Sequence, residues 1–250
     1  MLNEPTLQKL AQLKLSALAT AWTEQQASPE MQRLSFDERL GLLVDAEWLA
    51  RDNKRLGRRL KEAKLRLSQA CLEDIKYGPR RELDPAQLRQ LGTCLWVQQH
   101  HNVLVTGMTG TGKTFVACAL AQQACRKGFR VAYRRTSRLF EELALARADG
   151  SYARLLERFS HVDLLVLDDW GLVPTKSTER SDLLEILEDR FGVRSTLIAS
   201  QLPTTNWHDF LADPTLADAI LDRLVHNAHR IVLKGPSRRK EKLAGEPQED

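Results

Sequence analysis

Apolar residues recur at helical spacing through the first part of the chain. The first such positions are Leu7, Leu10, Leu13, Leu15 and Leu18. This pattern predicts a helical stretch, and Ser28-Pro29 is expected to end it. A second helix is expected from Ser35, because Glu38 follows three residues later at the spacing of a capping box. Residues 1–78 are therefore predicted to form a small all-helical N-terminal domain.

The second predicted helix has two apolar sets. Its first turns carry Phe36, Leu40, Leu43 and Trp48. Farther along, the apolar positions are Leu49, Leu56, Leu60, Ala63 and Leu67. Steps of seven, four, three and four residues place the second set on one face, so we expect one buried stripe surrounded by charge.

The pattern changes after Tyr77-Gly78-Pro79, which is expected to break the helix. Short apolar runs then alternate with helical stretches. The predicted strands are residues 101–106, 130–134, 164–167, 195–200 and 230–234. This alternation predicts an α/β domain with a parallel sheet over residues 79–240. Two helical stretches, 137–148 and 152–159, separate the second and third strands. A plain crossover needs only one helix, so the second stretch is an insertion. The polar end, 241–250, is predicted to be disordered.

A glycine-rich segment follows the first strand and precedes a helix. Its sequence from Gly107 to Thr114 is G-x-x-x-x-G-K-T, the P-loop pattern. Lys113 would contact the β- and γ-phosphates of a nucleotide, and the hydroxyl of Thr114 would serve Mg²⁺. The predicted nucleotide-binding residues are Gly107, Met108, Thr109, Gly110, Thr111, Gly112, Lys113, Thr114 and Phe115. The segment before the strand is expected to hold the base, with Leu83 and Leu88 as candidates.

Two carboxylates end the third predicted strand, in the form of a Walker B motif. Asp168 is expected to hold Mg²⁺ together with Thr114, and Asp169 to orient or polarise the attacking water. Asp169 is one methylene shorter than the glutamate of many ATPases, which predicts slow hydrolysis or dependence on a partner. At the end of the fourth strand, Ser200 or Gln201 is expected to sense the γ-phosphate. These residues predict an ATPase that uses ATP and Mg²⁺.

Charge is concentrated in one segment. The chain carries a net charge of +4, but residues 51–81 hold eleven Lys or Arg against four Asp or Glu. A concentrated basic stretch is typical of contact with a phosphate-rich partner. The DNA-binding candidates are Arg51, Lys54, Arg55, Arg58 and Arg59, with a second cluster at Arg134, Arg135 and Arg138. The alternative for the first run is a solvated helix face.

No apolar run is long enough to span a bilayer, and the N-terminus lacks the features of a signal peptide. None of the four cysteines forms a C-x-x-C pair. We therefore expect a cytoplasmic protein with no membrane partner and with reduced, packed cysteines. The adjacent His100 and His101 are interpreted as strand-edge residues, without a metal site.

Residues 81–240 resemble the AAA+ ATPases of the initiator and helicase-loader branch. They resemble the IstB-type transposition helper ATPases of bacterial insertion sequences more closely. The similar segments are 107–114, 162–171 (VDLLVLDDWG), 200–207 (SQLPTTNW) and 221–240 (LDRLVHNAHRIVLKGPSRRK). The N-terminal part is similar in layout, so the resemblance covers nearly the whole chain.

This resemblance implies a P-loop AAA+ core whose five-stranded parallel sheet has the order 5-1-4-3-2. Only 17 residues follow Leu233, so we expect no separate C-terminal lid domain, which is a departure from many AAA+ proteins. The resemblance also implies that the insertion after the second strand lines DNA. Arg223 matches the arginine finger that reaches a neighbour's nucleotide, and Arg239 matches the second sensor arginine. Gln201 stands where loaders usually carry Asn.

The implied function is that of a transposase helper. It would oligomerise on duplex DNA with ATP, hydrolyse ATP, and present or remodel the DNA for the transposase. Its hydrolysis is expected to be stimulated by DNA or by oligomer formation. Three alternatives stay open: a replicative helicase loader, an ATP-switched DNA-binding adaptor with little turnover, and a small-molecule P-loop kinase.

Overall fold

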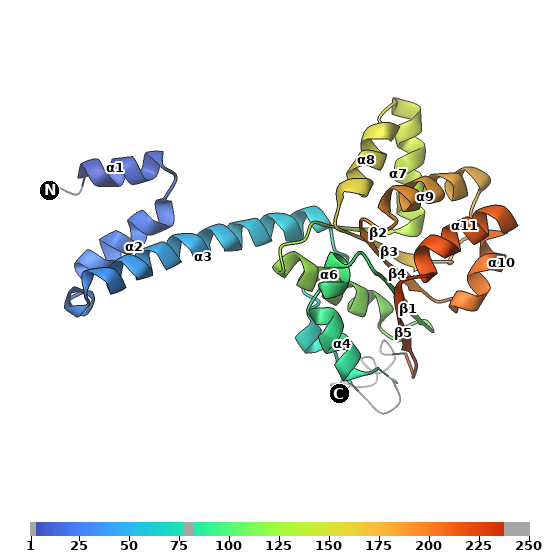
Figure 1. Cartoon of the computed structure of the whole chain (residues 1–250), viewed down its shortest axis with the longest axis horizontal. Helices are drawn as coiled ribbons and strands as arrows, with labels where there is room; N and C mark the ends of the chain where they lie inside the picture. Colours follow the sequence, from blue (N-terminus) through green and yellow to red (C-terminus); the bar gives the residue numbers. More distant parts are fainter. Residues whose placement is uncertain (1–3, 78–82, 238–250) are drawn as a thin grey trace, which may run out of the picture. The chain divides into compact units, whose positions relative to one another are not determined.

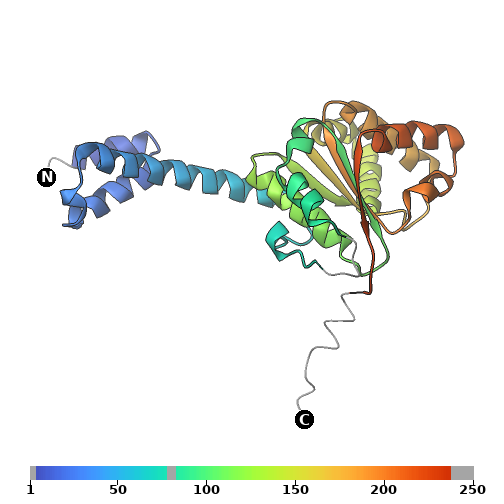
Figure 2. The same ribbon diagram turned by 60° about the horizontal axis from the view of Figure 1, so that its bottom comes forward.

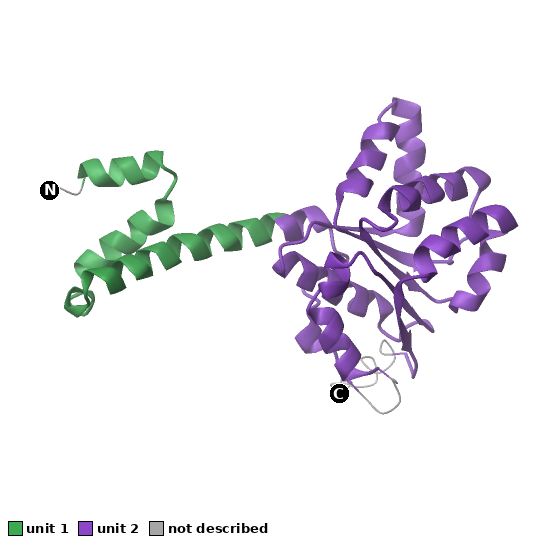
Figure 3. Cartoon of the chain, viewed as in Figure 1, with its two compact units in different colours: residues 1–58 green, residues 59–250 purple. Residues whose placement is uncertain are grey.

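The computed structural model describes residues 4–77 and 83–237. The chain forms two compact units, residues 1–58 and 59–250 (Figure 3). The division falls inside a helix, between Arg58 and Arg59. The expected boundary at residue 78 lies outside the described residues, and residues 59–77 group with the second unit. The expected tail, 241–250, also lies outside the described residues.

The first unit is helical, as predicted. It contains α1 (Glu4–Gln12), α2 (Ser16–Ala27), a 3-10 turn η1 (Met31–Arg33) and the first part of α3 (Phe36–Ala63). The capping box is present: the Ser35 amide donates to the Glu38 carboxylate at 2.8 Å, and the Glu38 amide donates to the Ser35 hydroxyl at 3.3 Å. These bonds explain why α3 begins at Phe36.

Buried Glu47 connects α3 to the start of α2. Its carboxylate accepts hydrogen bonds from the amides of Ala17 and Leu18 at 3.0 and 3.1 Å. These amides have no partner within their own helix, and α2 has no side-chain cap of its own. Arg51 donates to Glu47 at 2.7 Å and lowers the pKa of this carboxyl group. Glu47 therefore replaces the missing cap from a neighbouring helix.

The single buried stripe expected along α3 is wrong. Leu49 is 55% exposed, and Leu67 lies beyond the end of the helix. Lys64 adopts a left-handed backbone conformation with φ of 53°, so the helix stops at Ala63 and its periodicity cannot continue. Phe36 and Trp48 are also exposed, at 74% and 66%.

The second unit is built on a five-stranded parallel sheet. Its strands are β1 (Asn102–Gly107), β2 (Val131–Arg135), β3 (Leu164–Trp170), β4 (Ser195–Ser200) and β5 (Ala228–Leu233). Their order is β2-β3-β4-β1-β5, which confirms the order predicted from the resemblance. Successive residues of β3 and β4 are almost all buried, as expected for a parallel sheet with both faces covered.

Helices cover both faces of this sheet (Figures 1 and 2). On one face lie α4 (Pro85–Gly92), α5 (Leu95–Gln98) and α6 (Lys113–Arg126), with the 3-10 turn η2 (Leu72–Asp74) against α6. The other face carries α7 (Thr136–Asp149), α8 (Tyr152–His161), α9 (Ser177–Arg190), the 3-10 turn η3 (Thr204–Asn206), α10 (Trp207–Leu211) and α11 (Pro214–Val225). The core beneath this second layer contains Phe159, Trp170 and Trp207.

The predicted insertion is α8, which follows α7, and polar contacts attach this pair of helices to α9. Arg147 lies over the ring of Tyr152 at 3.7 Å and forms an ion pair with buried Asp182. The Tyr152 hydroxyl donates to Asp182 and to Glu185, each at 2.8 Å. The insertion is therefore a packed part of this layer.

Candidate nucleotide-binding site

The glycine-rich segment lies between β1 and α6, in the strand–loop–helix context that a P-loop requires. Gly112 is the N-cap of α6 and has φ of 102°, a conformation that side chains disfavour. Gly110 has φ of 85°, and a Cβ built on it would lie 3.1 Å from the Cα of Ser237. The segment that follows β5 therefore lies directly against the loop.

Lys113 is the first residue of α6, directly after the loop. Its ammonium group donates to the carbonyl oxygen of Met108 at 2.8 Å, and the residue is only 9% exposed. The hydroxyl of Thr111 donates to the same carbonyl at 2.8 Å. A buried lysine charge among backbone groups at a helix N-terminus is the arrangement that binds phosphate.

Asp168 joins the Walker B strand to the P-loop. It is 1% exposed, and its carboxylate accepts hydrogen bonds from the Thr114 hydroxyl at 2.8 Å and the Tyr133 hydroxyl at 2.7 Å. Burial and the charge of Asp168 raise the pKa of Tyr133, so its phenol stays protonated and donates. The paired oxygens of Thr114 and Asp168 are ligands of the type that Mg²⁺ prefers, so the predicted pair fits this ion.

Asp169 has different surroundings. The register between β3 and β4 shifts between Leu167 and Trp170, and Asp169 has φ of 58° within this irregularity. Its carboxylate is partly exposed and lies 3.4 Å from the guanidinium of Arg66. Asp169 lies near the end of β3, as the sequence predicts. The sequence gave no indication that Arg66 contacts it.

Of the two candidates for the γ-phosphate sensor, the structure places Gln201 in the site. The Thr109 hydroxyl of the P-loop donates to the Gln201 amide oxygen at 2.7 Å. Ser200 is buried and donates to the carbonyl oxygen of Trp170 at 2.8 Å, so its hydroxyl joins β4 to β3.

Residues of the P-loop, Asp169 and Gln201 line a cavity of about 770 Å³. Its volume suits a nucleotide. It is lined by Arg66, Leu67, Glu73, Asp74, Ile75, Lys76, Thr109, Gly110, Gly112, Lys113, Thr114, Phe115, Asp169 and Gln201. Leu83 and Leu88, the expected contacts for the base, are buried and do not line it. The segment Glu73–Lys76 lines the cavity instead. The sequence did not indicate this, because residues 1–78 were predicted to form the helical N-terminal domain.

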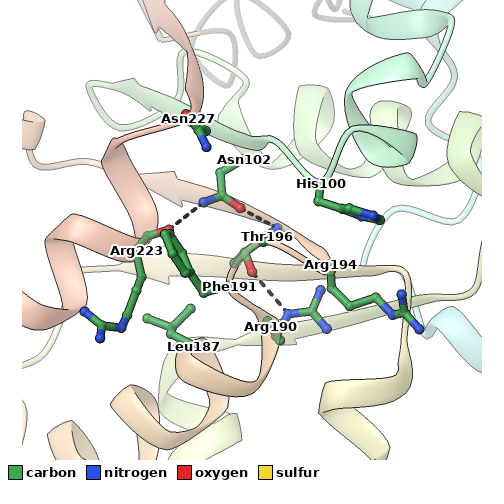
Figure 4. A pocket seen from close by; sticks show the side chains of 10 residues that line it. His100, Asn102, Leu187, Arg190, Phe191, Arg194, Thr196, Arg223 and Asn227 are labelled. Atoms are coloured by element: carbon green, nitrogen blue, oxygen red, sulfur yellow. Dashed lines mark hydrogen bonds between the residues drawn. The ribbon is translucent and has the colours of Figure 1, made fainter.

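Arg223 lies near the end of α11, close to Asn102 (Figure 4). The Asn102 amide donates to the carbonyl oxygens of Arg223 and Leu224 at 2.9 and 3.1 Å, and it accepts from the Thr196 amide at 2.8 Å. Asn102 begins β1, whereas the P-loop follows the end of this six-residue strand. At about 3.3 Å per residue, Asn102 and the residue that follows β1 are about 20 Å apart.

The side chain of Arg223 has partners within its own chain. It contacts Glu188 on α9 at 2.5 Å and donates to the carbonyl oxygen of Ala219 at 2.8 Å. The hydrogen bond from Arg223 lowers the pKa of Glu188. The cavity beside them in Figure 4 has a volume of about 10 Å³, room for about one water molecule. Phe191 and Val193, in the same region, are 46% and 50% exposed.

The predicted DNA contacts separate into groups. The expectation for Arg134 is corrected: it is 5% exposed, pairs with Glu142 at 2.9 Å and donates to the carbonyl of Tyr133, so it is not presented at a surface. Arg138 is exposed and pairs with Glu141, while Arg135 is half-buried. Arg51 is occupied by Glu47 and by the carbonyl of Lys14.

The remaining basic candidates lie on α3. Lys54, Arg55 and Arg58 are exposed, and Arg59 is half-buried. The second sensor candidate, Arg239, lies outside the described residues. Within the described ranges 4–77 and 83–237, no helix is both long and apolar enough to cross a membrane.

Solved structures of other proteins share this fold. The chain matches the structure of DnaI with a TM-score of 0.56 and 19% identity, over 66% of this chain and 92% of the other. The DnaC helicase loader matches with a TM-score of 0.53 and 22% identity, over 66% and 97%. At these identities the likeness shows the fold alone.

Sequence comparison extends over nearly the whole chain. A Sinorhizobium fredii protein, described as an insertion sequence ATP-binding protein, is 51% identical over 96% of this chain and 98% of its own length. A Pseudomonas fluorescens protein described as the ATP-binding protein of insertion sequence IS1162 is 49% identical over 82% and 89%. The sequence model of the IstB-like ATP binding proteins matches residues 8–244. The chain belongs to the IstB-like ATP binding protein family.

Proposed function

We propose that this chain is a DNA-dependent ATPase that assists a transposase. The observation that carries this proposal is the hydrogen bond between Thr114 and Asp168, which joins the P-loop to the Walker B strand at one cavity. Relatives that are described as insertion sequence ATP-binding proteins support the transposition context. ATP binding would control assembly of several copies on duplex DNA.

Five residues in or beside the cavity have distinct tasks in hydrolysis. Lys113 and the amides of the P-loop bind the β- and γ-phosphates. Thr114 and Asp168 would hold Mg²⁺, which offsets phosphate charge when it is bound. Gln201 orients the γ-phosphate beside Thr109. Asp169 accepts the proton of the attacking water as the water oxygen bonds to the γ-phosphorus, and the bond from that phosphorus to the bridging oxygen breaks to release ADP.

Arg223 serves a neighbouring copy in this proposal. It lies at the far edge of the sheet from its own P-loop, so it cannot reach the nucleotide of its own cavity. The exposed apolar side chains of Phe191 and Val193 support a contact with another copy at this edge. On assembly, the guanidinium would leave Glu188 and meet charge that develops on the neighbour's γ-phosphate.

Three alanine variants test the ATPase assignment. Lys113→Ala should lose ATP binding, because it removes the cation from the phosphate site. Asp168→Ala should lose Mg²⁺-dependent binding, whereas Asp169→Ala should still bind ATP and release no phosphate. Nucleotide titration beside a phosphate-release assay separates these outcomes.

The control is Lys127→Ala, which removes an exposed lysine at the other end of α6. This variant should match the wild type in both assays. Unchanged nucleotide affinity in Lys113→Ala would reject the loop as the phosphate site. Equal loss of binding in the two aspartate variants would reject the division of their roles.

A further inference from the structure

Arg66 brings a positive charge into the nucleotide cavity from outside the P-loop and Walker motifs. It follows α3 in the chain and lines the cavity together with Lys113 and Gln201. Its guanidinium Nη1 lies 3.4 Å from Oδ2 of Asp169, a residue 103 positions later. In the sequence, Arg66 is one of the basic residues of the segment 51–81.

The two aspartates differ in how firmly they are held. Asp168 is buried and accepts hydrogen bonds from Thr114, Tyr133 and the amide of Asp169. The Asp169 carboxylate is 26% exposed and is contacted by Arg66, whose side chain is 42% exposed. An ion pair this exposed is weak, so a stronger competitor can break it.

The nucleotide itself supplies that competitor. A γ-phosphate in this cavity carries more negative charge than a carboxylate, and guanidinium groups bind phosphate with paired hydrogen bonds. While Arg66 stays on Asp169, it neutralises the carboxylate that must accept a proton from water. When Arg66 moves to the γ-phosphate, it releases Asp169.

We propose that Arg66 is a positioning residue that restrains Asp169 until a γ-phosphate draws its guanidinium away. The inference rests on the proposed ATPase function, and it adds a residue that distinguishes ATP from ADP within one subunit. ADP lacks the γ-phosphate, so it leaves the contact between Arg66 and Asp169 in place.

Binding measurements on four full-length proteins test this proposal without hydrolysis. They are the wild type, Arg66→Ala, Asp169→Asn and the double variant, each titrated with Mg²⁺ and either a non-hydrolysable ATP analogue or ADP. Arg66→Ala should weaken the triphosphate about tenfold, the effect of one charge-assisted hydrogen bond, and leave ADP within about twofold. Arg66→Lys should recover part of this loss, because it keeps the charge but loses the planar fork.

Asp169→Asn should tighten the triphosphate, because Arg66 is then free to bind it. The gain in affinity that comes from freeing Arg66 corresponds to the strength of an exposed ion pair, up to about fivefold. It should disappear when Arg66 is also alanine. Loss of negative charge near the phosphates could tighten binding by itself, but such a gain would persist in the double variant.

The control is Arg130→Ala. Arg130 pairs with Asp163 at 3.5 Å with comparable exposure, at the amino end of β3. It should leave both affinities unchanged. Equal binding of both nucleotides by Arg66→Ala and the wild type, or an Asp169→Asn gain that persists in the double variant, would overturn the inference. A wild type that binds neither nucleotide would instead overturn the proposed function.

Discussion

At the carboxyl end of β3, adjacent aspartates have opposite surroundings, and this difference assigns their chemistry. Asp168 accepts hydrogen bonds from Thr114 and Tyr133, which fix the orientation of its carboxylate beside the P-loop. Asp169 stands in a left-handed conformation and contacts Arg66. The buried residue is suited to a metal, and the accessible residue is suited to a water molecule.

Gly110 is required for a reason beyond backbone conformation. Its φ is 85°, and an added Cβ would meet the Ser237 side chain at 2.1 Å and the Ser237 Cα at 3.1 Å. We predict that Gly110→Ala lowers the melting temperature of the nucleotide-free protein and weakens ATP binding, because either the loop or the segment after β5 must move. Thermal unfolding and nucleotide titration measure the two effects.

Gly150→Ala is the matched control for this change. Gly150 has φ of 77°, but nothing lies within 4 Å of an added Cβ. It should therefore show only the conformational cost of a left-handed residue, about 1–2 kcal/mol, and normal ATP affinity. Equal effects of the two substitutions on stability and binding would reject the contact with Ser237 as the cause.

At single residues, sequence reasoning succeeded where a motif fixes the position in the chain. The P-loop and Asp169 line one cavity, Asp168 accepts a hydrogen bond from Thr114, and Gln201 reaches Thr109. Tyr133 and Arg66 were missed because their roles depend on tertiary contacts. Tyr133 sits in an apolar strand pattern, and Arg66 lies in a basic run that resembles any solvated helix face.

Among the elements, α3 carries the basic residues that the sequence predicts to contact DNA. It is 28 residues long, and Lys54, Arg55 and Arg58 are exposed on it. We predict that duplex binding requires ATP, is largely independent of sequence and weakens steeply with salt. If six phosphates are neutralised, affinity should fall by about 10³ between 50 and 200 mM salt.

Charge reversal on α3 tests this contact. Lys54→Glu with Arg55→Glu should weaken duplex binding and flatten its salt dependence, as measured by fluorescence anisotropy. Lys9→Glu with Arg33→Glu makes the same charge change at exposed positions of the first unit outside the basic run, and it should bind normally. Wild-type affinity in the α3 variant would remove α3 from the interface, and a marked preference for single strands would contradict a duplex-binding helper.

Element boundaries followed the sequence where local signals were strong. The capping box at Ser35 starts α3, and Asp84 and Asp213 each accept a hydrogen bond from the first turn of α4 and α11. The apolar stripe along α3 failed because residues such as Leu49 face solvent. Spacing describes which residues share a face, but only tertiary packing decides whether that face is covered.

In the whole molecule, the groups that the proposed function assigns to ATP hydrolysis lie at the two ends of the strands of one sheet. The cavity with Lys113 and Asp169 is at the carboxyl edge, and Arg223 is at the amino edge. The strand order of the sheet was predictable because the motifs and the resemblance specify an AAA+ core. The pairing of Arg223 with Glu188 was not predictable, because the two residues lie on different helices.

The separation of these edges leads to the central claim, that each active site is completed by a neighbouring copy. Arg223→Ala should bind ATP and remain folded, yet fail to hydrolyse it, because an arginine finger changes turnover by about 10³ to 10⁵. Arg194→Ala is the control, since Arg194 lines the same small cavity and pairs with Asp163. It should retain turnover.

The most direct measurement is the ATPase rate of a mixture of two inactive proteins on duplex DNA. Asp169→Ala supplies a sound arginine with a dead cavity, and Arg223→Ala supplies a sound cavity without the arginine. In an equal, random mixture, about one interface in four joins a sound cavity to a sound arginine, so activity should return to about a quarter of the wild-type rate. Full activity of Arg223→Ala alone, or no recovery although both proteins bind ATP and DNA, would contradict this account.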